Sequence, residues 1–294
     1  MSDAAALLPL LRQVTALQDM TLIFAGMCWH EFISNIEYDW KLLRRQEIRR
    51  PMVAHIAQWT YMLCRVIMVV YGCCIFTAAF PIPGGPDCHV LLKILITTNV
   101  LGIMCSSTLL SIRVGAIWKW SKRIVALLVM LWCIILAFAI YFVVKVQSTY
   151  EAVLRNCSLD GVHNDLYPSI AMLICDCTLL TLLLVGLQIN WRNARQFEMW
   201  NALWQQGLAY LFLATLIEVP VVTLLSLDIN PIMNSMFVSP EAIILPIGAT
   251  RMFRSLNAAV HGSRSKRIDT FTTGATQDMT LVPREVELQA LRRR

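Results

Sequence analysis

Six apolar runs, each long enough to cross a bilayer as a helix, limit what this chain folds into more than any other feature of its sequence. The runs cover residues 53–80, 90–112, 124–146, 168–190, 205–227 and 234–256. A transmembrane helix needs about 20 consecutive, mostly apolar residues. Hydrophobic residues make up 57% of the 294-residue chain and charged residues only 15%, which is more apolar surface than one soluble core can bury. The sequence therefore predicts an all-α polytopic membrane protein whose first partner is the lipid bilayer.

A shorter apolar segment at 16–36 precedes the six runs. Its continuous apolar core extends only from Met20 to Trp29, after which Glu31 and Glu37 interrupt it. The segment therefore has two interpretations, a first membrane-spanning helix or an amphipathic helix at the membrane surface. No basic n-region and no compact apolar core with a cleavage site come before it, so no cleavable signal peptide is expected.

The distribution of Lys and Arg predicts the orientation of the chain. With seven spans and the N-terminus outside, the cytoplasmic segments are 39–51, 113–123, 191–204 and 251–294. These segments hold 20 of the 25 Lys and Arg residues, as expected for loops on the cytoplasmic side. A six-span chain would keep the same alternation and leave its N-terminus inside. We predict seven helices in a receptor-like bundle, with the N-terminus outside and the C-terminus inside.

Two regions are expected along the chain, a transmembrane domain over 1–256 and a cytoplasmic tail over 257–294. The tail begins with a basic stretch and continues as a polar sequence without a clear apolar face. The basic stretch is expected to lie along the anionic inner leaflet and the remainder to be disordered. No sorting motif selects a membrane, so the plasma membrane is the default location of this multi-pass protein.

Two of the ten cysteines, Cys88 and Cys157, fall in segments predicted to lie outside the membrane. Because both share an oxidising compartment, we predict a disulfide between them, with two free thiols as the alternative. Asn156 begins an N-x-S sequence and is a possible glycosylation site, although a sugar there would compete for space with the disulfide. The other eight cysteines lie within or beside apolar runs, where a free thiol acts as a small hydrophobic side chain.

Five polar side chains lie in the outer halves or near the middle of the predicted spans. They are Lys93, Asn99, Asp176, Glu218 and Glu241. Ionisable residues inside a membrane are costly to bury and mark functional sites by default. We predict that these residues line a ligand cavity open to the outside. In the structural alternative, Lys93 and Glu241 extend to the interface, and Asp176 pairs with a hydroxyl or a backbone carbonyl.

Arg65 lies in the middle of the span 53–80 and needs a buried partner. The candidates are Glu31, Asp176 and Glu218, and we predict a buried ion pair with Glu31. Such a pair is expected to be structural rather than catalytic.

The five histidines give no enzyme signature. None belongs to an HExxH motif or to a pair of intramembrane haem ligands, and no GxSxG or phosphate-binding glycine loop is found. The alternative to this reading is a membrane hydrolase with an outer metal site. Its metal ligands would be His89, His163 and Asp165. We therefore expect no catalytic residue, no metal, no cofactor and no nucleic-acid partner.

Several stretches of the chain resemble one protein family. The segment "NIEYDWKLLRRQEIRRPMVAHIAQWTYMLCRVIMVVYG" resembles the opening signature of seven-helix integral membrane proteins from basidiomycete fungi. That signature is an acidic first helix ending in a pattern like EIEYIW, then a basic loop and a second helix with an arginine. "SIRVGAIWKWSKRIVALLV" is similar to the stretch after their third helix. The residues that match are Ile36, Glu37, Tyr38, Trp40, Arg65 and Arg113.

The resemblance covers about 30–255 and implies that 16–36 is a genuine span. The chain departs from the family at Asp39, where an apolar residue is usual, and at His30 and Glu31, where a Tyr-Asp pair is usual. The family is grouped under a domain of unknown function. The resemblance therefore implies a fold and no activity.

Three functions are compatible with these features. In the leading prediction, a receptor-like protein binds an unknown small-molecule ligand from outside, among the spans 90–112, 168–190, 205–227 and 234–256, and a cytosolic signalling partner on its basic inner loops. The topology and the outer cysteine pair resemble those of G-protein-coupled receptors, without their acidic-Arg-aromatic and NPxxY motifs. The second function is a proton- or ion-coupled transporter that uses buried charges as a relay. The third is a membrane-embedded metal hydrolase.

Overall fold

The computed structural model describes eight stretches of the chain, which together hold the helices and one small sheet. The described residues are 2–44, 52–80, 88–145, 147–151, 156–160, 166–194, 198–227 and 236–258. The structure also describes most side chains in these ranges. The exceptions are the side chains of the first residues of the chain, of Cys88, of the small sheet and of the facing ends of α6 and α7.

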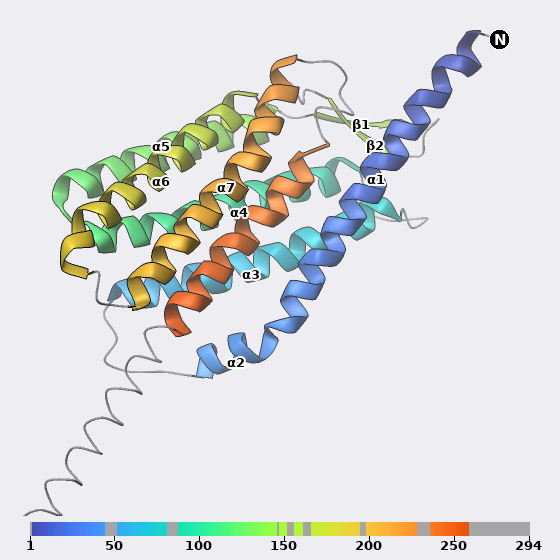
Figure 1. Ribbon diagram of the computed structural model, residues 1–294. Helices are drawn as coiled ribbons and strands as arrows, with labels where there is room; N and C mark the ends of the chain where they lie inside the picture. The colour runs from blue at the N-terminus through green and yellow to red at the C-terminus, as the bar shows by residue number, and fades with distance from the viewer. Residues whose placement is uncertain are drawn as a thin grey trace, which may run out of the picture.

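The described residues form long helices that run alongside one another as a bundle (Figure 1). The helices are α1 (Ser2–Ser34), α2 (Ile36–Arg44), α3 (Met52–Ala79), α4 (Cys88–Ile117), α5 (Lys122–Lys145), α6 (Leu166–Ala194), α7 (Glu198–Leu227) and a final helix at 238–258. In Figure 1 the final helix, drawn orange to red, lies between α7 and α1. α1 projects beyond one end of the bundle, and the short α2 turns back beneath the other end.

Four helices are long and apolar enough to cross a membrane. They are Met52–Ala79, His89–Ile117, Lys122–Lys145 and Leu166–Ile189, and a shorter apolar segment lies at Phe212–Leu227. This confirms the predicted helical, membrane-embedded chain. The count of seven spans and their orientation stay predictions, because α1, α7 and the final helix are not among the four found in the described residues.

The predicted loop between α5 and α6 contains a small sheet, which the all-helical prediction did not include. Strands β1 (Gln147–Glu151) and β2 (Asn156–Asp160) pair antiparallel, with Tyr150 opposite Cys157. Both strands lie against α4.

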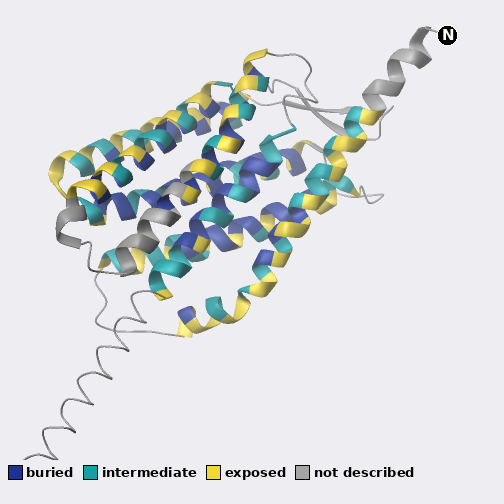
Figure 2. Cartoon of the chain, viewed as in Figure 1, coloured by how far each residue is buried: buried dark blue, intermediate teal, exposed yellow. Residues whose placement is uncertain are grey.

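The outside of the bundle is apolar, as lipid contact requires. Large hydrophobic side chains are exposed on several helices, for example Trp59, Val144, Ile174 and Phe212. Exposed residues follow the outward faces of α1 and α5 in Figure 2, whereas buried residues concentrate on α4. In water such a surface would aggregate, but in a bilayer it costs nothing, because the lipid tails are equally apolar.

α4 is the central helix and contacts α3, α5 and α6. Its end is fixed against α6 by Trp118, whose indole N–H donates to the Leu182 carbonyl at 3.0 Å. Only glycine fits at position 186, since a Cβ there would lie 2.8 Å from the indole nitrogen of Trp118. The chain then turns through Lys119 and Trp120, with φ angles of 50° and 54°, before α5 begins. This tight turn holds the basic segment 113–123 close to the bundle.

Candidate functional site: two buried polar clusters

Two groups of polar residues stand out in the apolar bundle, and all of their members except the exposed Arg251 are largely buried. The first, the ionic cluster, joins α1, α2, α3 and the final helix. Its members are Glu31, Asp39, Tyr61, Arg65, Arg251 and Arg254. The second, the carboxyl cluster, joins α4, α6 and α7. Its members are Ser107, Asp176, Tyr210 and Glu218.

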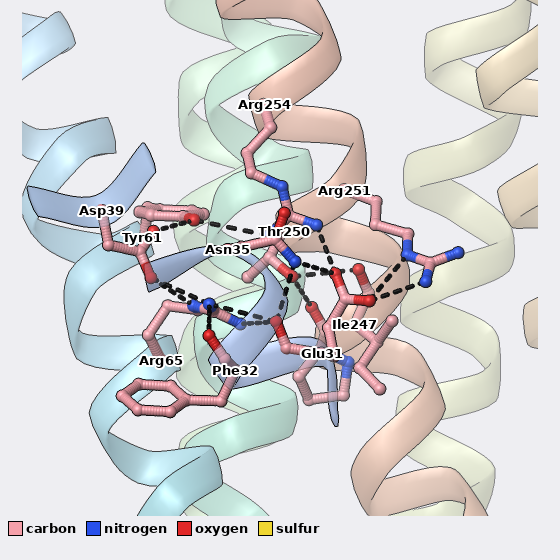
Figure 3. A network of polar contacts seen from close by, with 11 residues as sticks. Glu31, Phe32, Asn35, Asp39, Tyr61, Arg65, Ile247, Thr250, Arg251 and Arg254 are labelled. Carbon is pink, nitrogen blue, oxygen red and sulfur yellow. Dashed lines mark hydrogen bonds and ion pairs between the residues drawn. The ribbon is translucent and has the colours of Figure 1, made fainter. Parts of the chain in front are cut away.

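Glu31 is the centre of the ionic cluster (Figure 3). Its carboxylate is almost fully buried and accepts hydrogen bonds from two arginines of the final helix. Arg251 donates to Oε2 from Nη2 at 2.6 Å and from Nε at 3.2 Å, while Arg254 binds Oε1. The side-chain amide of Asn35 adds a bond to Oε1 at 3.1 Å. Glu31 therefore ties α1 to the final helix through charge-assisted bonds, which are the stronger class of hydrogen bond.

Arg65 ties α3 to α1 and α2. Its guanidinium binds Asp39 Oδ2, through Nη2 at 2.8 Å and Nε at 2.9 Å. It also donates to the backbone carbonyls of Glu31 at 3.3 Å and Phe32 at 3.1 Å, near the end of α1. The last carbonyls of a helix have no partner within the helix and carry partial negative charge, so a cation there is favourable. Arg65 therefore caps α1 as well as neutralising Asp39.

Tyr61 links the two ion pairs. Its hydroxyl donates to Asp39 Oδ1 and accepts a long bond, 3.5 Å, from Arg254 Nη1. Its ring stacks on Phe253 with 4.8 Å between ring centres. Glu31, Asp39 and their arginines thus form one connected network rather than two isolated pairs.

The predicted ion pair between Arg65 and Glu31 is wrong in its partners. Arg65 reaches only the backbone carbonyl of Glu31, and its charge is balanced by Asp39. The chain breaks helical continuity at Asn35, where a turn separates α1 from α2. That break redirects Asp39 toward α3 and leaves Glu31 facing the final helix.

The remaining residues of the family-like signature lie along α2. Glu37 forms an exposed ion pair with Lys41 at 2.6 Å, which lowers the pKa of the Glu37 carboxyl. Tyr38 is packed inward, and its hydroxyl accepts a bond from Asn257 at 2.7 Å. Ile36 and Trp40 are exposed. The signature therefore lines both faces of a short helix beside the ionic cluster.

Acidic side chains in the carboxyl cluster face each other instead of a base. Asp176 and Glu218 are each about 2% exposed, and their carboxyl groups interact directly. Ser107 donates to Asp176 Oδ1 at 3.0 Å. Among the described residues, Asp176 Oδ2, Glu218 Oε1 and the Tyr210 hydroxyl have no partner in hydrogen-bond geometry. Unpartnered buried oxygens are rare and costly, so this group needs an explanation beyond packing.

Arg113 is buried near the carboxyl cluster without belonging to it. Its two terminal nitrogens have no hydrogen-bond partner in the described part of the chain. Of the titratable side chains, Tyr210 interacts with it, whereas Asp176 and Glu218 do not.

No family model matches this chain. A search of curated proteins finds no match either. The resemblance to the fungal seven-helix family stays a prediction, and function has to be inferred from the two clusters.

The five predicted cavity residues are only partly brought together. Asp176 and Glu218 meet in the carboxyl cluster, and the buried Glu241 of the final helix acts electrostatically on Glu218. Asn99 is half-buried on α4, whereas Lys93 is exposed on the surface of the same helix. Asp176 and Glu218 are thus brought together, whereas Glu241 acts on Glu218 only electrostatically. The exposed Lys93 is consistent with the alternative that it extends to the interface.

Among the hollows formed by described residues are three that contain no predicted cavity residue in their lining. Two neighbouring apolar hollows, of about 340 and 270 Å³, lie between α5 and α6 and share Phe138 and Tyr167. The third, of about 260 Å³, lies between α7 and the final helix, beside Tyr210, Arg251 and Ser255.

Other predicted sites fall partly outside the described residues. The side chains of Cys88, Asn156, Cys157 and His163 lie there, so the disulfide, the glycosylation site and the outer metal site stay predictions. The other eight cysteines are free thiols, as expected. Within the described ranges, no three His, Cys, Asp or Glu side chains gather as metal ligands.

Proposed function

We propose that this protein is a receptor-like membrane protein with seven spanning helices, its N-terminus outside and its tail in the cytosol. Its ionic cluster is the switch that holds the cytoplasmic ends of the helices in a closed arrangement. One observation carries the proposal: the Glu31 carboxylate binds Arg251 and Arg254 of the final helix at the end of the bundle predicted to face the cytosol. The plasma membrane is the proposed location.

The cluster has the properties that a two-state switch requires. Its bonds join four separate elements. A displacement of the final helix by about 1–2 Å, typical of helix shifts in switching proteins, would therefore break several of them at once. A buried carboxylate that loses its base is strongly unfavourable. The closed arrangement is therefore sharply defined. An outer ligand that moves the final helix would have to supply the free energy needed to break these bonds.

Opening would uncover a basic surface for a cytosolic partner. The turn at Lys119 and Trp120 lies in one of the basic segments predicted to face the cytosol, and the segment 39–51 is another. A surface of this charge favours an acidic partner.

The proposal is tested by measuring a distance across the cluster. Nitroxide labels are placed at Leu43→Cys and Ala258→Cys, both exposed positions, in a protein whose exposed Cys73 and Cys133 are replaced by serine. Pulsed electron paramagnetic resonance in nanodiscs should give one narrow distance for the parent and an additional, longer distance for Glu31→Gln. The matched control, Glu37→Gln, removes an exposed carboxylate nearby and should give the parent distribution. A folded Glu31→Gln protein with the parent distribution would rule out the switch.

The topology is tested separately. Protease protection and thiol labelling of both termini in cells should place the N-terminus outside and the tail inside. If both termini are cytosolic, α1 does not span, and the seven-helix receptor proposal is abandoned.

A second function, ion- or proton-coupled transport, is favoured by the buried carboxyl cluster. Intramembrane carboxyl groups near the middle of a bundle are typical of ion and proton pathways. If the protein is a carrier, substrate flux into proteoliposomes should be abolished by Glu218→Gln while the protein stays folded.

A further inference from the structure

We propose that the carboxyl cluster is a binding site for one monovalent cation, either a proton shared between Asp176 and Glu218 or a Na⁺ ion. The site is distinct from the ionic cluster, and the inference does not depend on whether the protein is a receptor or a carrier.

The first argument is the charge of the surroundings. From α6 and α7, the Asp176 and Glu218 carboxyl groups face each other. The final helix adds a third carboxyl group, Glu241, which also acts on Glu218. α4 contributes the hydroxyl of Ser107, and the buried Arg113 acts on Tyr210 instead. None of the described basic side chains is a partner of either carboxyl group.

The second argument is the set of unpartnered atoms. Asp176 Oδ2, Glu218 Oε1 and the Tyr210 hydroxyl are each buried without a hydrogen-bond partner in the part of the chain described. Tyr210 is itself only 4% exposed and is close enough for both carboxyl groups to act on it. Two carboxylates cannot both stay ionised in a dry site without a counter-charge. A bound cation supplies that charge and a partner for the free oxygens.

The third argument concerns the identity of the cation. All the free ligand atoms are hard oxygen donors, which suit a proton or an alkali ion rather than a soft metal. Divalent ions are usually held by several carboxylates, and no three acidic, histidine or cysteine side chains gather within the described ranges. The shared chemistry is therefore a single positive charge.

Two readouts on the full chain in nanodiscs distinguish the two cations. The first is the thermal unfolding midpoint at constant ionic strength, with NaCl exchanged stepwise for choline chloride. The second is the infrared band of a protonated carboxyl group near neutral pH. If the site binds Na⁺, NaCl raises the midpoint with a saturable dependence, and Glu218→Gln weakens the apparent Na⁺ affinity at least tenfold. If it holds a proton, NaCl has no specific effect, and the carboxyl band is present and is lost in Glu218→Gln.

Other outcomes overturn the proposal. Wild-type protein with neither a Na⁺-specific shift nor a protonated carboxyl band has no such site. The same conclusion follows if either signal survives unchanged in both Glu218→Gln and Asp176→Asn. Because Asp176→Asn changes the bond to Ser107 and could impair folding, Ser107→Ala serves as a second variant, which should alter the Na⁺ affinity or shift the band. Glu37→Gln is the matched control and should leave both readouts unchanged.

Discussion

The two clusters bury similar carboxyl groups in opposite ways. In the ionic cluster, Asp39 meets one guanidinium and Glu31 meets two, so each carboxylate is balanced by arginine within the protein. In the carboxyl cluster, Asp176 and Glu218 meet each other, and no described base balances them. The difference shows that burial alone does not define the role of a carboxyl group in this bundle. A balanced cluster specifies how helices are arranged, whereas an unbalanced one needs something from outside the chain.

Removing Arg65 from the ionic cluster should have the largest effect on stability. Arg65→Leu leaves Asp39 as a buried, unpaired carboxylate and the end of α1 without its cap. The free energy of unfolding should fall by about 3–5 kcal/mol, the usual cost of breaking a buried pair by removing one partner. Chemical unfolding in mixed micelles measures it. In an Asp39→Asn background the same substitution should cost clearly less, and an equal cost would show that Arg65 does not act through Asp39.

A matched pair of substitutions tests the comparison directly. Glu31→Gln weakens bonds to two arginines and should lower the free energy of unfolding by about 2–3 kcal/mol, since hydrogen bonds to charged groups contribute about 1.5–3 kcal/mol. Most of this loss should come from the bond to Arg254, because the ion pair with the largely exposed Arg251 contributes little to stability. Glu218→Gln should change stability by less than about 1 kcal/mol or increase it, because it removes a charge that no base balances. Similar losses in both variants would remove the distinction between the clusters.

A substitution that touches neither cluster separates packing from charge. Gly186→Ala places a Cβ 2.7 Å from Ile117 Cγ2 and 2.8 Å from the Trp118 indole nitrogen. Overpacking of this kind should cost about 1–3 kcal/mol. At Gly26 on α1 there is open space, so Gly26→Ala is the control and should stabilise the helix by about 0.5–1 kcal/mol. Thermal unfolding of both proteins measures the two opposite changes in stability. A Gly186→Ala protein as stable as the parent would contradict the prediction.

The smallest effect is expected at the exposed pair of Glu37 and Lys41. Both side chains are largely in solvent, so Lys41→Ala should leave the unfolding midpoint unchanged within error. A clear loss of stability in this variant would mean that exposed charges near α2 contribute to the arrangement attributed to the ionic cluster.

Much of the helical framework follows from the sequence. The runs at 53–80, 90–112, 124–146 and 168–190 fall in α3, α4, α5 and α6, because about 20 consecutive apolar residues specify a membrane helix almost by themselves. The buried positions of Asp176 and Glu218 were also predicted, since charges inside such runs are conspicuous. The pairing of β1 with β2 was not predicted, because the two strands carry no long apolar or alternating pattern.

The partners of the buried charges could not be predicted in the same way. Apolar runs give no information on how one helix is rotated against another, and the turn at Asn35 decides where Asp39 and Glu31 point. Asp39 was noted only as a departure from the fungal family, and Arg251 and Arg254 only as basic residues marking the cytoplasmic side. One signal in the sequence could have identified these partners. The acidic residues Glu31 and Asp39 and the basic residues Arg251 and Arg254 all lie near the same predicted end of their spans.

The bonds of Glu31 also bear on how the protein is made. Its two arginine partners lie 220 and 223 positions further along the chain. At the usual synthesis rate of about 5–20 residues per second, the ribosome needs roughly 10 to 40 s to reach the first of them. Throughout that interval the nascent chain carries a carboxylate without its lasting counter-ion. A product that stops before position 251 never acquires one, so the arrangement of α1 against the final helix depends on synthesis of nearly all of the bundle.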